Sequence, residues 1–464
     1  MSNSSTSSSQ SNELSATKAR QRRLLSLAHG ITNLPELIRR RRFGVQVPVN
    51  FETVQTTNSR CPCCTHSLAP VKMSIFKAAS VLAKKRLRSF KMDTRRCYLC
   101  GYLVCIDCWS AEYMERTVGR VVAIVVCTRC HANVQACDYS EVSDSRYHHG
   151  PVKVVEDPSD DSAAPLLIDF LQASLMNVST DHADRAAILS VIRMLLHQNK
   201  EYSSDDEDSS DYDDSDHVTM QVLDKFLRNK EQLPDVASCK LTSAEHREYL
   251  IDLPVDPSTM VPSSVIPSHD NVRLRLANDK GLLQLAHQLA PLDSSSISID
   301  QVCDVRDLDL LCQLAVRAMD CSNAFVTVMG INHNHVLATT NPGFQHAVVP
   351  REQTICQHTI MTTSPFVATH PEADVRFHKI MPVKALSIRF YVGFPVLVSK
   401  IDDSGNEFDI PVGTLCCTDS TARGELTRTQ YRTMEQLTNT ASRLIQLKAK
   451  QLQDQTTKLD KRAM

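Results

Sequence analysis

The sequence contains no long apolar run. The longest candidate, Val118–Cys127, spans ten residues, about half of the roughly 20 that a membrane helix needs, and its composition favours a strand. The first residues, 1–13, are polar and contain no apolar core, so no secretory signal peptide is expected. We therefore expect a cytoplasmic protein whose cysteines are free thiols or metal ligands rather than disulfides.

A large net charge is also lacking. The 51 basic and 53 acidic residues leave a net charge of -2, which argues against a polycation that binds nucleic acid. This balance results from the cancellation of local extremes. Residues 71–96 contain nine Lys and Arg and one acid, whereas residues 201–216 contain nine Asp and Glu and no base. The acidic segment should stay solvated because like charges at this density repel one another.

Catalytic signatures are absent from the sequence as well. No Ser-His-Asp pattern, phosphate-binding glycine loop or paired carboxylate site can be recognised. We therefore expect a non-enzymatic adaptor or sensor rather than an enzyme.

Cysteine, in contrast, is abundant. Eight of the 17 cysteines form four CxxC pairs, namely Cys61/Cys64, Cys97/Cys100, Cys105/Cys108 and Cys127/Cys130. A CxxC turn places two thiolates at the spacing that one tetrahedral zinc ion requires, and four such ligands close a structural site. The pattern therefore predicts two structural zinc ions per chain. Spacing alone permits either sequential or interleaved pairing of the four CxxC pairs.

The stretch RRCYLCGYLVCIDC, residues 95–108, resembles the central block of the FYVE-type zinc finger. The resemblance implies a cross-brace, with Cys61, Cys64, Cys105 and Cys108 on one zinc and Cys97, Cys100, Cys127 and Cys130 on the other. It also implies phosphoinositide binding at an endosomal membrane. The histidines of the family's lipid-reading block are missing from Asp93–Arg96, and its arginine is missing from Ala123–Val126. The resemblance therefore implies the zinc scaffold rather than a pocket that selects phosphatidylinositol 3-phosphate.

Basic residues around the third cysteine are the candidate membrane contact. Those expected to meet an anionic lipid surface are Lys84, Lys85, Arg86, Arg88, Arg95 and Arg96. Two alternatives remain open. The first is a protein-protein interaction module in which zinc is purely structural. The second is a RING-type ubiquitin ligase, which is also cross-braced but usually has a histidine among its middle ligands.

The C-terminal half resembles a GAF domain over residues 271–450. The segments that carry the resemblance are Thr354–Ile360, Pro365–Val367, Asp374–Phe377, Ile388–Pro395 and Pro411–Cys416. The resemblance implies an α+β fold on an antiparallel sheet that binds a small molecule or dimerises. The leucines between Leu437 and Leu452 recur near helical spacing and suggest a homodimer.

Two cysteine arrangements in this region call for interpretation. Cys356 precedes His358 by two residues, which is similar to the bilin attachment of some GAF domains, but we favour a packed core thiol. Cys416 and Cys417 are adjacent on a predicted strand and should point to opposite faces of the sheet, so a disulfide between them is not expected.

The predicted organisation is multidomain, with a small metal-stabilised α+β finger and an α+β GAF-like domain joined by disordered acidic and Pro/Ser-rich linkers. The expected segments are a disordered start at 1–13, a basic amphipathic segment at 14–50, the finger at 51–140, a linker at 141–163, a helical hairpin at 164–200, the acidic and Pro/Ser-rich linker at 201–270, the GAF-like domain at 271–450 and a helix end at 451–464.

Overall fold

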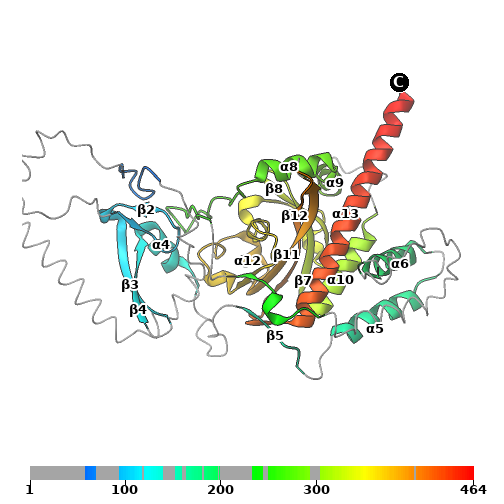
Figure 1. Cartoon of the computed structure of the whole chain (residues 1–464), viewed down its shortest axis with the longest axis horizontal. Coiled ribbons are helices and arrows are strands. Elements are labelled where there is room, and N and C mark those ends of the chain that lie inside the picture. The colour runs from blue at the N-terminus through cyan, green and yellow to red at the C-terminus, as the bar shows by residue number, and fades with distance from the viewer. Residues whose placement is uncertain are drawn as a thin grey trace, which may run out of the picture.

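The computed structural model describes a cysteine-rich module and a larger α+β domain (Figure 1). The described residues are 58–68, 94–117, 120–138, 152–158, 163–179, 182–196, 198, 233–243, 249–292, 304–401 and 404–463. The basic insertion with Lys84, Lys85, Arg86 and Arg88, like the segments 1–50 and 201–232, lies outside them. Within the described residues, no helix combines the length and apolar character that crossing a membrane requires.

The larger domain is built on a seven-stranded sheet in the order β6-β10-β11-β12-β7-β8-β9. Every pairing is antiparallel except that of β6 with β10. The strands are β6 Thr242–Ser243, β7 Asn323–Met329, β8 His333–Thr339, β9 Val348–Pro350, β10 Phe366–Thr369, β11 Phe390–Ile401 and β12 Glu407–Asp419. The antiparallel sheet expected from the resemblance is therefore confirmed.

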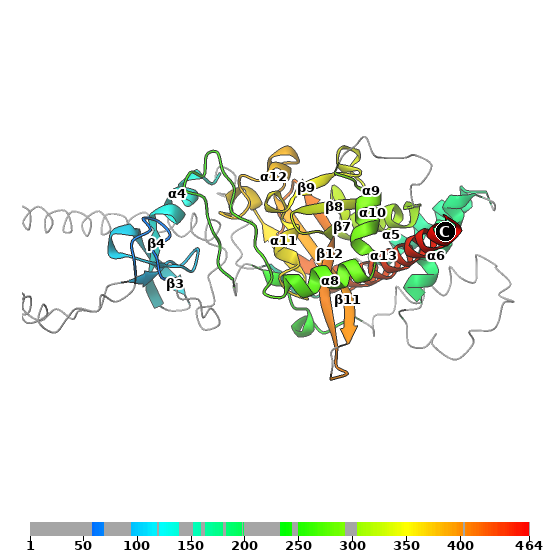
Figure 2. The same cartoon turned by 90° about the horizontal axis from the view of Figure 1, so that it is seen from above.

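Long helices cover one face of this sheet (Figures 1 and 2). They are α8 Asp270–Asp279, α9 Leu282–Leu289, α10 Arg306–Met319 and α13 Arg428–Ala463, and α5 Ala163–Met176 and α6 Ala183–Leu196 pack on the outer side of α10 and α13. Their apolar sides form one buried cluster with Val326, Val392 and Leu415 of the sheet. Burial of this apolar surface is the main source of stability for the face.

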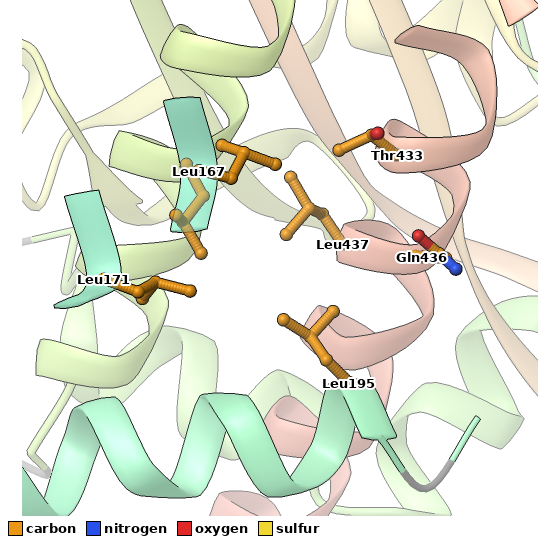
Figure 3. A pocket seen from close by; sticks show the side chains of 7 residues that line it. Leu167, Leu171, Leu195, Thr433, Gln436 and Leu437 are labelled. Atoms are coloured by element: carbon orange, nitrogen blue, oxygen red, sulfur yellow. The ribbon is translucent and has the colours of Figure 1, made fainter. Parts of the chain in front are cut away.

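The hairpin of α5 and α6 docks on α10 and α13, as its two apolar stripes suggested. The Nε2 atom of Gln198 donates to the carbonyl oxygen of Gln436 at 2.9 Å, and Arg317 of α10 lies 3.5 Å from the ring centroid of Phe170. A small pocket remains between these helices (Figure 3). Its lining residues are Leu167, Leu171, Leu195, Leu314, Thr433, Gln436 and Leu437.

The helix α13 begins at a capping box. The backbone N–H of Gln430 donates to Oγ1 of Thr427, and the backbone N–H of Thr427 donates to Oε1 of Gln430, both at 3.1 Å. Leu437 and Leu444 are 1% exposed and belong to the domain's own core. The leucine stripe that suggested a dimer is thus largely used inside the domain, and Leu447, at 43% exposure, remains at the surface.

The apolar pattern of residues 274–289 reads as one helix, whereas the structure has two. Gly281 separates α8 from α9 with a left-handed φ of 70°. A Cβ atom at this position would lie 2.7 Å from the side chain of Gln453 on α13. Glycine is favoured here because it tolerates both the positive φ and the close approach.

In the part of the chain that the structure describes, the opposite face of the sheet carries short elements. They are η9 Pro342–Phe344, η10 Arg351–Gln353, α11 Cys356–Thr359, η11 Pro371–Ala373 and α12 Met381–Ala385. We call this side the ligand face, because it is the face that the long helices leave free. Cys416 belongs to its buried cluster, whereas Cys417 belongs to the helix-side core, so the expected opposite orientation of the two thiols is confirmed.

The cysteine-rich module consists of two short hairpins and one helix. Its elements are β1 Arg95–Arg96, β2 Leu103–Val104, η2 Ile106–Cys108, β3 Trp109–Thr117, β4 Arg120–Cys127 and α4 Thr128–Ala136. The apolar run Val118–Cys127 is largely the strand β4, as expected. Beyond the module, β5 Lys153–Val155 pairs in parallel with β13 Glu425–Thr427 at the start of α13.

Candidate metal centres and the ligand face

The first group of four cysteines joins a turn to a short helix. The turn at Cys61 is closed by a 2.8 Å hydrogen bond from the backbone N–H of Thr65 to the carbonyl oxygen of Cys61. Its second cysteine, Cys64, places Sγ 3.6 Å from Sγ of Cys105. Cys108 follows at the end of η2. Cys64 is exposed and the other three are buried, so the group lies at the edge of the module.

The second group, Cys97, Cys100, Cys127 and Cys130, is buried throughout. Gly101 closes the first turn with a φ of 85° and donates its N–H to the carbonyl oxygen of Cys97 at 3.0 Å. Backbone N–H groups also point at the sulfurs: that of Cys127 lies 3.3 Å from Sγ of Cys97, and that of Cys130 lies 3.4 Å from Sγ of Cys127. Such donors stabilise negative charge on the sulfur atoms.

The two groups are interleaved along the chain, as in the cross-brace arrangement. In each, the four sulfur atoms lie within 4.8 Å of one another, so both groups could hold a metal ion. Without an ion, four thiols this close cannot all ionise: burial raises the pKa of Cys130 well above its ordinary value, and hydrogen bonding with Cys100 raises it further. A bound cation reverses this effect and holds thiolates in place.

Three further potential ligands near the four CxxC pairs lie outside both groups. They are Cys63, His66 and Cys137. The Sγ of Cys137 donates to the carbonyl oxygen of Asn133 at 3.4 Å. His66 is exposed. Cys63 lies beside the second group, where hydrogen bonding with Cys127 raises its pKa.

The two described bases of the candidate lipid contact have different surroundings. Arg96 donates from Nη1 to the carbonyl oxygen of Gly101 at 2.8 Å, so it braces the turn of the second cysteine group. Arg95 is exposed, and its guanidinium lies 4.8 Å from the ring centroid of Trp109. Of the two residues, Arg95 is therefore the more exposed.

Residues 249–265, which we call the bridging segment, pack against the module. The expectation of a disordered linker is wrong here, because Ile251 and Leu253 are each 2% exposed and belong to the apolar cluster of the cysteines. The backbone N–H of Ile251 donates to the carbonyl oxygen of Cys100 at 3.2 Å. On α4, Asn133 donates from Nδ2 to the carbonyl oxygen of Pro254 at 3.0 Å.

The bridging segment also contacts the ligand face. The hydroxyl of Tyr249 lies 2.8 Å from Nδ1 of His358 on α11. The backbone N–H of Val265 donates to Oε1 of the neighbouring Gln357 at 2.9 Å. One short segment therefore connects the second cysteine group to α11.

The ligand face meets the module directly as well. The backbone N–H of Asp138 donates to the carbonyl oxygen of Glu372 at 3.2 Å, and Val375 packs into the cysteine cluster. Next to it, Arg376 pairs with Asp374 at 2.6 Å in full burial. The guanidinium lies 4.5 Å from the ring centroid of Phe377. This buried pair anchors the loop that receives the module.

The interior of the ligand face is filled by side chains of the chain itself. His358 lies 5.9 Å from Phe366 and 4.9 Å from Phe377 between ring centroids. Cys356 is 7% exposed, and its Sγ accepts from the Tyr391 hydroxyl at 3.5 Å. The interpretation of Cys356 as a packed core thiol agrees with this burial.

The sequence reasoning missed Tyr249, Arg376 and the pairing of Cys356 with Cys416. Ile251 and Leu253 alternate with polar residues in a proline-flanked stretch, which is the signal that could have marked the bridging segment as buried. No sequence signal could have paired Cys356 with Cys416, because they are 60 positions apart.

The GAF domain family model matches residues 282–445, so this part of the chain is a GAF domain. No curated protein matches the chain. Among solved structures, the chromophore-binding domain of the bacteriophytochrome RpBphP3 from R. palustris is 10% identical with a TM-score of 0.24. That match covers 38% of this chain and 63% of the bacteriophytochrome domain. This chain therefore spans less than two thirds of the length of that domain.

Two further structures are similar at the same level. The PixJ GAF domain of Thermosynechococcus elongatus, in its blue-light-absorbing form, is 14% identical with a TM-score of 0.23, covering 32% of this chain and 87% of that one. The phycocyanobilin-bound GAF domain of a cyanobacterial phytochrome is 12% identical with a TM-score of 0.24, covering 37% of this chain and 94% of that one.

Proposed function

We propose that this chain, which carries a GAF domain behind two interleaved four-cysteine groups, is a non-enzymatic zinc-binding adaptor. In this proposal the finger attaches the protein to a membrane or partner, and the GAF domain receives a small molecule or a protein. The observation that carries the proposal is the bridging segment, which touches Cys100 at one end and His358 at the other. Such a connection suits a protein that links two binding events.

Zinc is the metal that suits both cysteine groups. Soft thiolate ligands favour zinc over hard cations such as magnesium and calcium. Tetrahedral Zn–S bonds of 2.3 Å place neighbouring sulfurs about 3.8 Å apart, and the Sγ atoms of Cys64 and Cys105 lie 3.6 Å apart. With four protein ligands the ion has no open position for water, so its role is to hold the fold.

Anionic membrane is the proposed surface for the finger. The six candidate bases are Lys84, Lys85, Arg86, Arg88, Arg95 and Arg96. Each base near an anionic leaflet contributes about 1 kcal/mol, and this attraction decays over a Debye length of about 8 Å at physiological salt. Because Arg96 is engaged with Gly101, we propose charge-driven binding with little choice among phosphoinositides.

Vesicle binding tests this proposal. Changing Lys84, Lys85, Arg86 and Arg88 together to Ala should abolish most co-sedimentation with anionic vesicles, and high salt should weaken the wild type similarly. Arg95→Ala should reduce binding more than Arg96→Lys, which keeps the charge. Unaltered binding by the fourfold variant would rule out the insertion as the contact, whereas no vesicle binding by the wild type would favour the protein-only alternative. An autoubiquitination assay separates both from a RING ligase.

Removing the hydroxyl of Tyr249 tests the connection that the bridging segment makes between the second cysteine group and α11. Tyr249→Phe deletes the hydrogen bond to His358. A hydrogen bond contributes about 1 kcal/mol net to the stability of the folded state. Amide exchange at residues 356–360 should therefore accelerate roughly fivefold. Hydrogen exchange of the full chain is the measurement. The matched control is Tyr431→Phe. The Tyr431 hydroxyl donates to the carbonyl oxygen of Lys240 at 3.4 Å, and its loss should leave the amide exchange of residues 356–360 unchanged. Equal exchange in both variants would refute a bridge through Tyr249.

A further inference from the structure

Two buried thiols of the ligand face lie within reach of each other. Cys356 stands at the start of α11 and Cys416 lies on β12. Their Sγ atoms are 3.8 Å apart, and the residues are 7% and 2% exposed. Neither belongs to the two candidate metal groups. A disulfide requires an S–S distance of about 2.05 Å, so forming it requires the two sulfurs to approach further, by a movement of α11 or of the two side chains.

We propose that Cys356 and Cys416 form a redox modification site, in which a hydroperoxide converts the two thiols into a disulfide that ties α11 to β12. This goes beyond metal binding and adaptor function, since it makes the GAF domain itself responsive to an oxidant. The site requires no further cofactor, because the hydroperoxide is the oxidant.

The reaction balances in two steps. The thiolate of one cysteine attacks a peroxide oxygen, the O–O bond breaks, and a sulfenic acid forms while the departing hydroxide or alkoxide takes up a proton. The sulfur of the second thiol then attacks the sulfenic sulfur, the S–O bond breaks, and water leaves with the proton of that thiol. The two sulfurs lose two electrons in total, and hydrogen peroxide is reduced to two molecules of water.

The surroundings assign different roles to the two thiols. Hydrogen bonding from Cys416 lowers the pKa of Cys356, and the nearby Thr414 and Tyr391 lower it further against the effect of burial. The same hydrogen bond raises the pKa of Cys416, because Cys356 holds the negative charge. The Tyr391 hydroxyl also donates to Sγ of Cys356 at 3.5 Å, so we assign the attacking thiolate to Cys356 and the resolving thiol to Cys416.

Geometry also limits the partners of Cys356. Cys417 is adjacent to Cys416 but lies in the helix-side core, where it interacts with Cys321. Cys356, in contrast, sits in α11, a helix of only four residues that are all buried. A peroxide therefore reaches Cys356 through a local opening of α11 that leaves the sheet folded.

The test uses the full, zinc-loaded chain treated with hydrogen peroxide, alkylated under denaturing conditions and digested with trypsin. Cleavage after Arg351 and Arg376 releases peptide 352–376, which carries Cys356 as its only cysteine, and cleavage after Lys400 and Arg423 releases peptide 401–423, which carries Cys416 and Cys417. We expect these two peptides to be joined and lighter by two hydrogen atoms. A thiol reductant should separate them.

Two variants complete the test. Cys417→Ser should preserve the linked peptides, which assigns the bond to Cys416, whereas Cys416→Ser should abolish them and leave Cys356 to oxidise to the sulfinic acid. The oxidised wild type should also melt at a higher temperature than the reduced protein, because the bond closes a long loop. The proposal is overturned if Cys356 stays alkylatable in peroxide-treated wild type, or if Cys417→Ser removes the link.

Discussion

Replacing Cys97 and Cys100 together by Ser is expected to remove at least one of two bound zinc ions and to unfold the cysteine-rich module. Within the module, the apolar cluster contains seven of the eight paired cysteines and, besides Cys137, five buried leucines and valines, so a small core remains without the ions. Structural zinc in comparable finger peptides binds with about 10–16 kcal/mol of free energy, which is also their folding free energy. Native mass spectrometry of the full chain measures the zinc count.

Two single variants serve as controls for the zinc count. Cys63→Ser and Cys137→Ser change thiols that lie outside both four-cysteine groups, so each should retain two ions per chain. A wild-type protein with one zinc or none would refute the two-site interpretation, as would a double variant that still holds two. Loss of the module should also increase amide exchange at residues 371–378, which contact it through Glu372 and Val375.

Asp374→Ala is expected to destabilise the GAF domain strongly. The side chains of Asp374 and Arg376 are 2% and 1% exposed and pair at 2.6 Å, and removing one partner leaves the other charge buried without compensation. Breaking a buried pair in this way costs about 3–5 kcal/mol. Thermal unfolding of the full chain measures the effect, with an expected fall in Tm of roughly 10 °C for a domain of this size.

A surface ion pair provides the control for this variant. Arg432 and Glu435 also pair at 2.6 Å, but their side chains are 30% and 41% exposed, and exposed pairs contribute at most about 1 kcal/mol. Glu435→Ala should therefore change Tm only slightly. If both variants lower Tm equally, the buried pair does not hold the loop that receives the module.

Local patterns in the sequence predicted a large part of the fold. A capping box at Thr427 and Gln430, alternating apolar residues in the strands and apolar stripes in α5 and α6 are all readable from short-range spacing in the sequence. Regular periodicity suffices for such elements, because each one buries one face and exposes the other. Gly281 separates α8 from α9 through its positive φ of 70°, which the spacing of apolar residues alone does not reveal.

The cysteine pattern and the packing between modules illustrate the limit of such prediction. Spacing identified eight thiols but left their grouping open, and the interleaved grouping came from the resemblance before the structure displayed it. The Pro-rich stretch around Ile251 has the composition of a linker, yet it is buried because the cysteine module and the GAF domain supply apolar surface on both sides.

The sequence by itself determined the chemistry that this protein carries: eight paired thiols, a basic insertion, a GAF signature and a capped terminal helix. Only the tertiary structure decided which groups meet. It placed Tyr249 against His358, buried Arg376 with Asp374 and brought Cys356 within 3.8 Å of Cys416. The physical reason is that periodicity and spacing describe neighbours along one element, whereas these contacts join segments whose approach depends on how separate faces pack together.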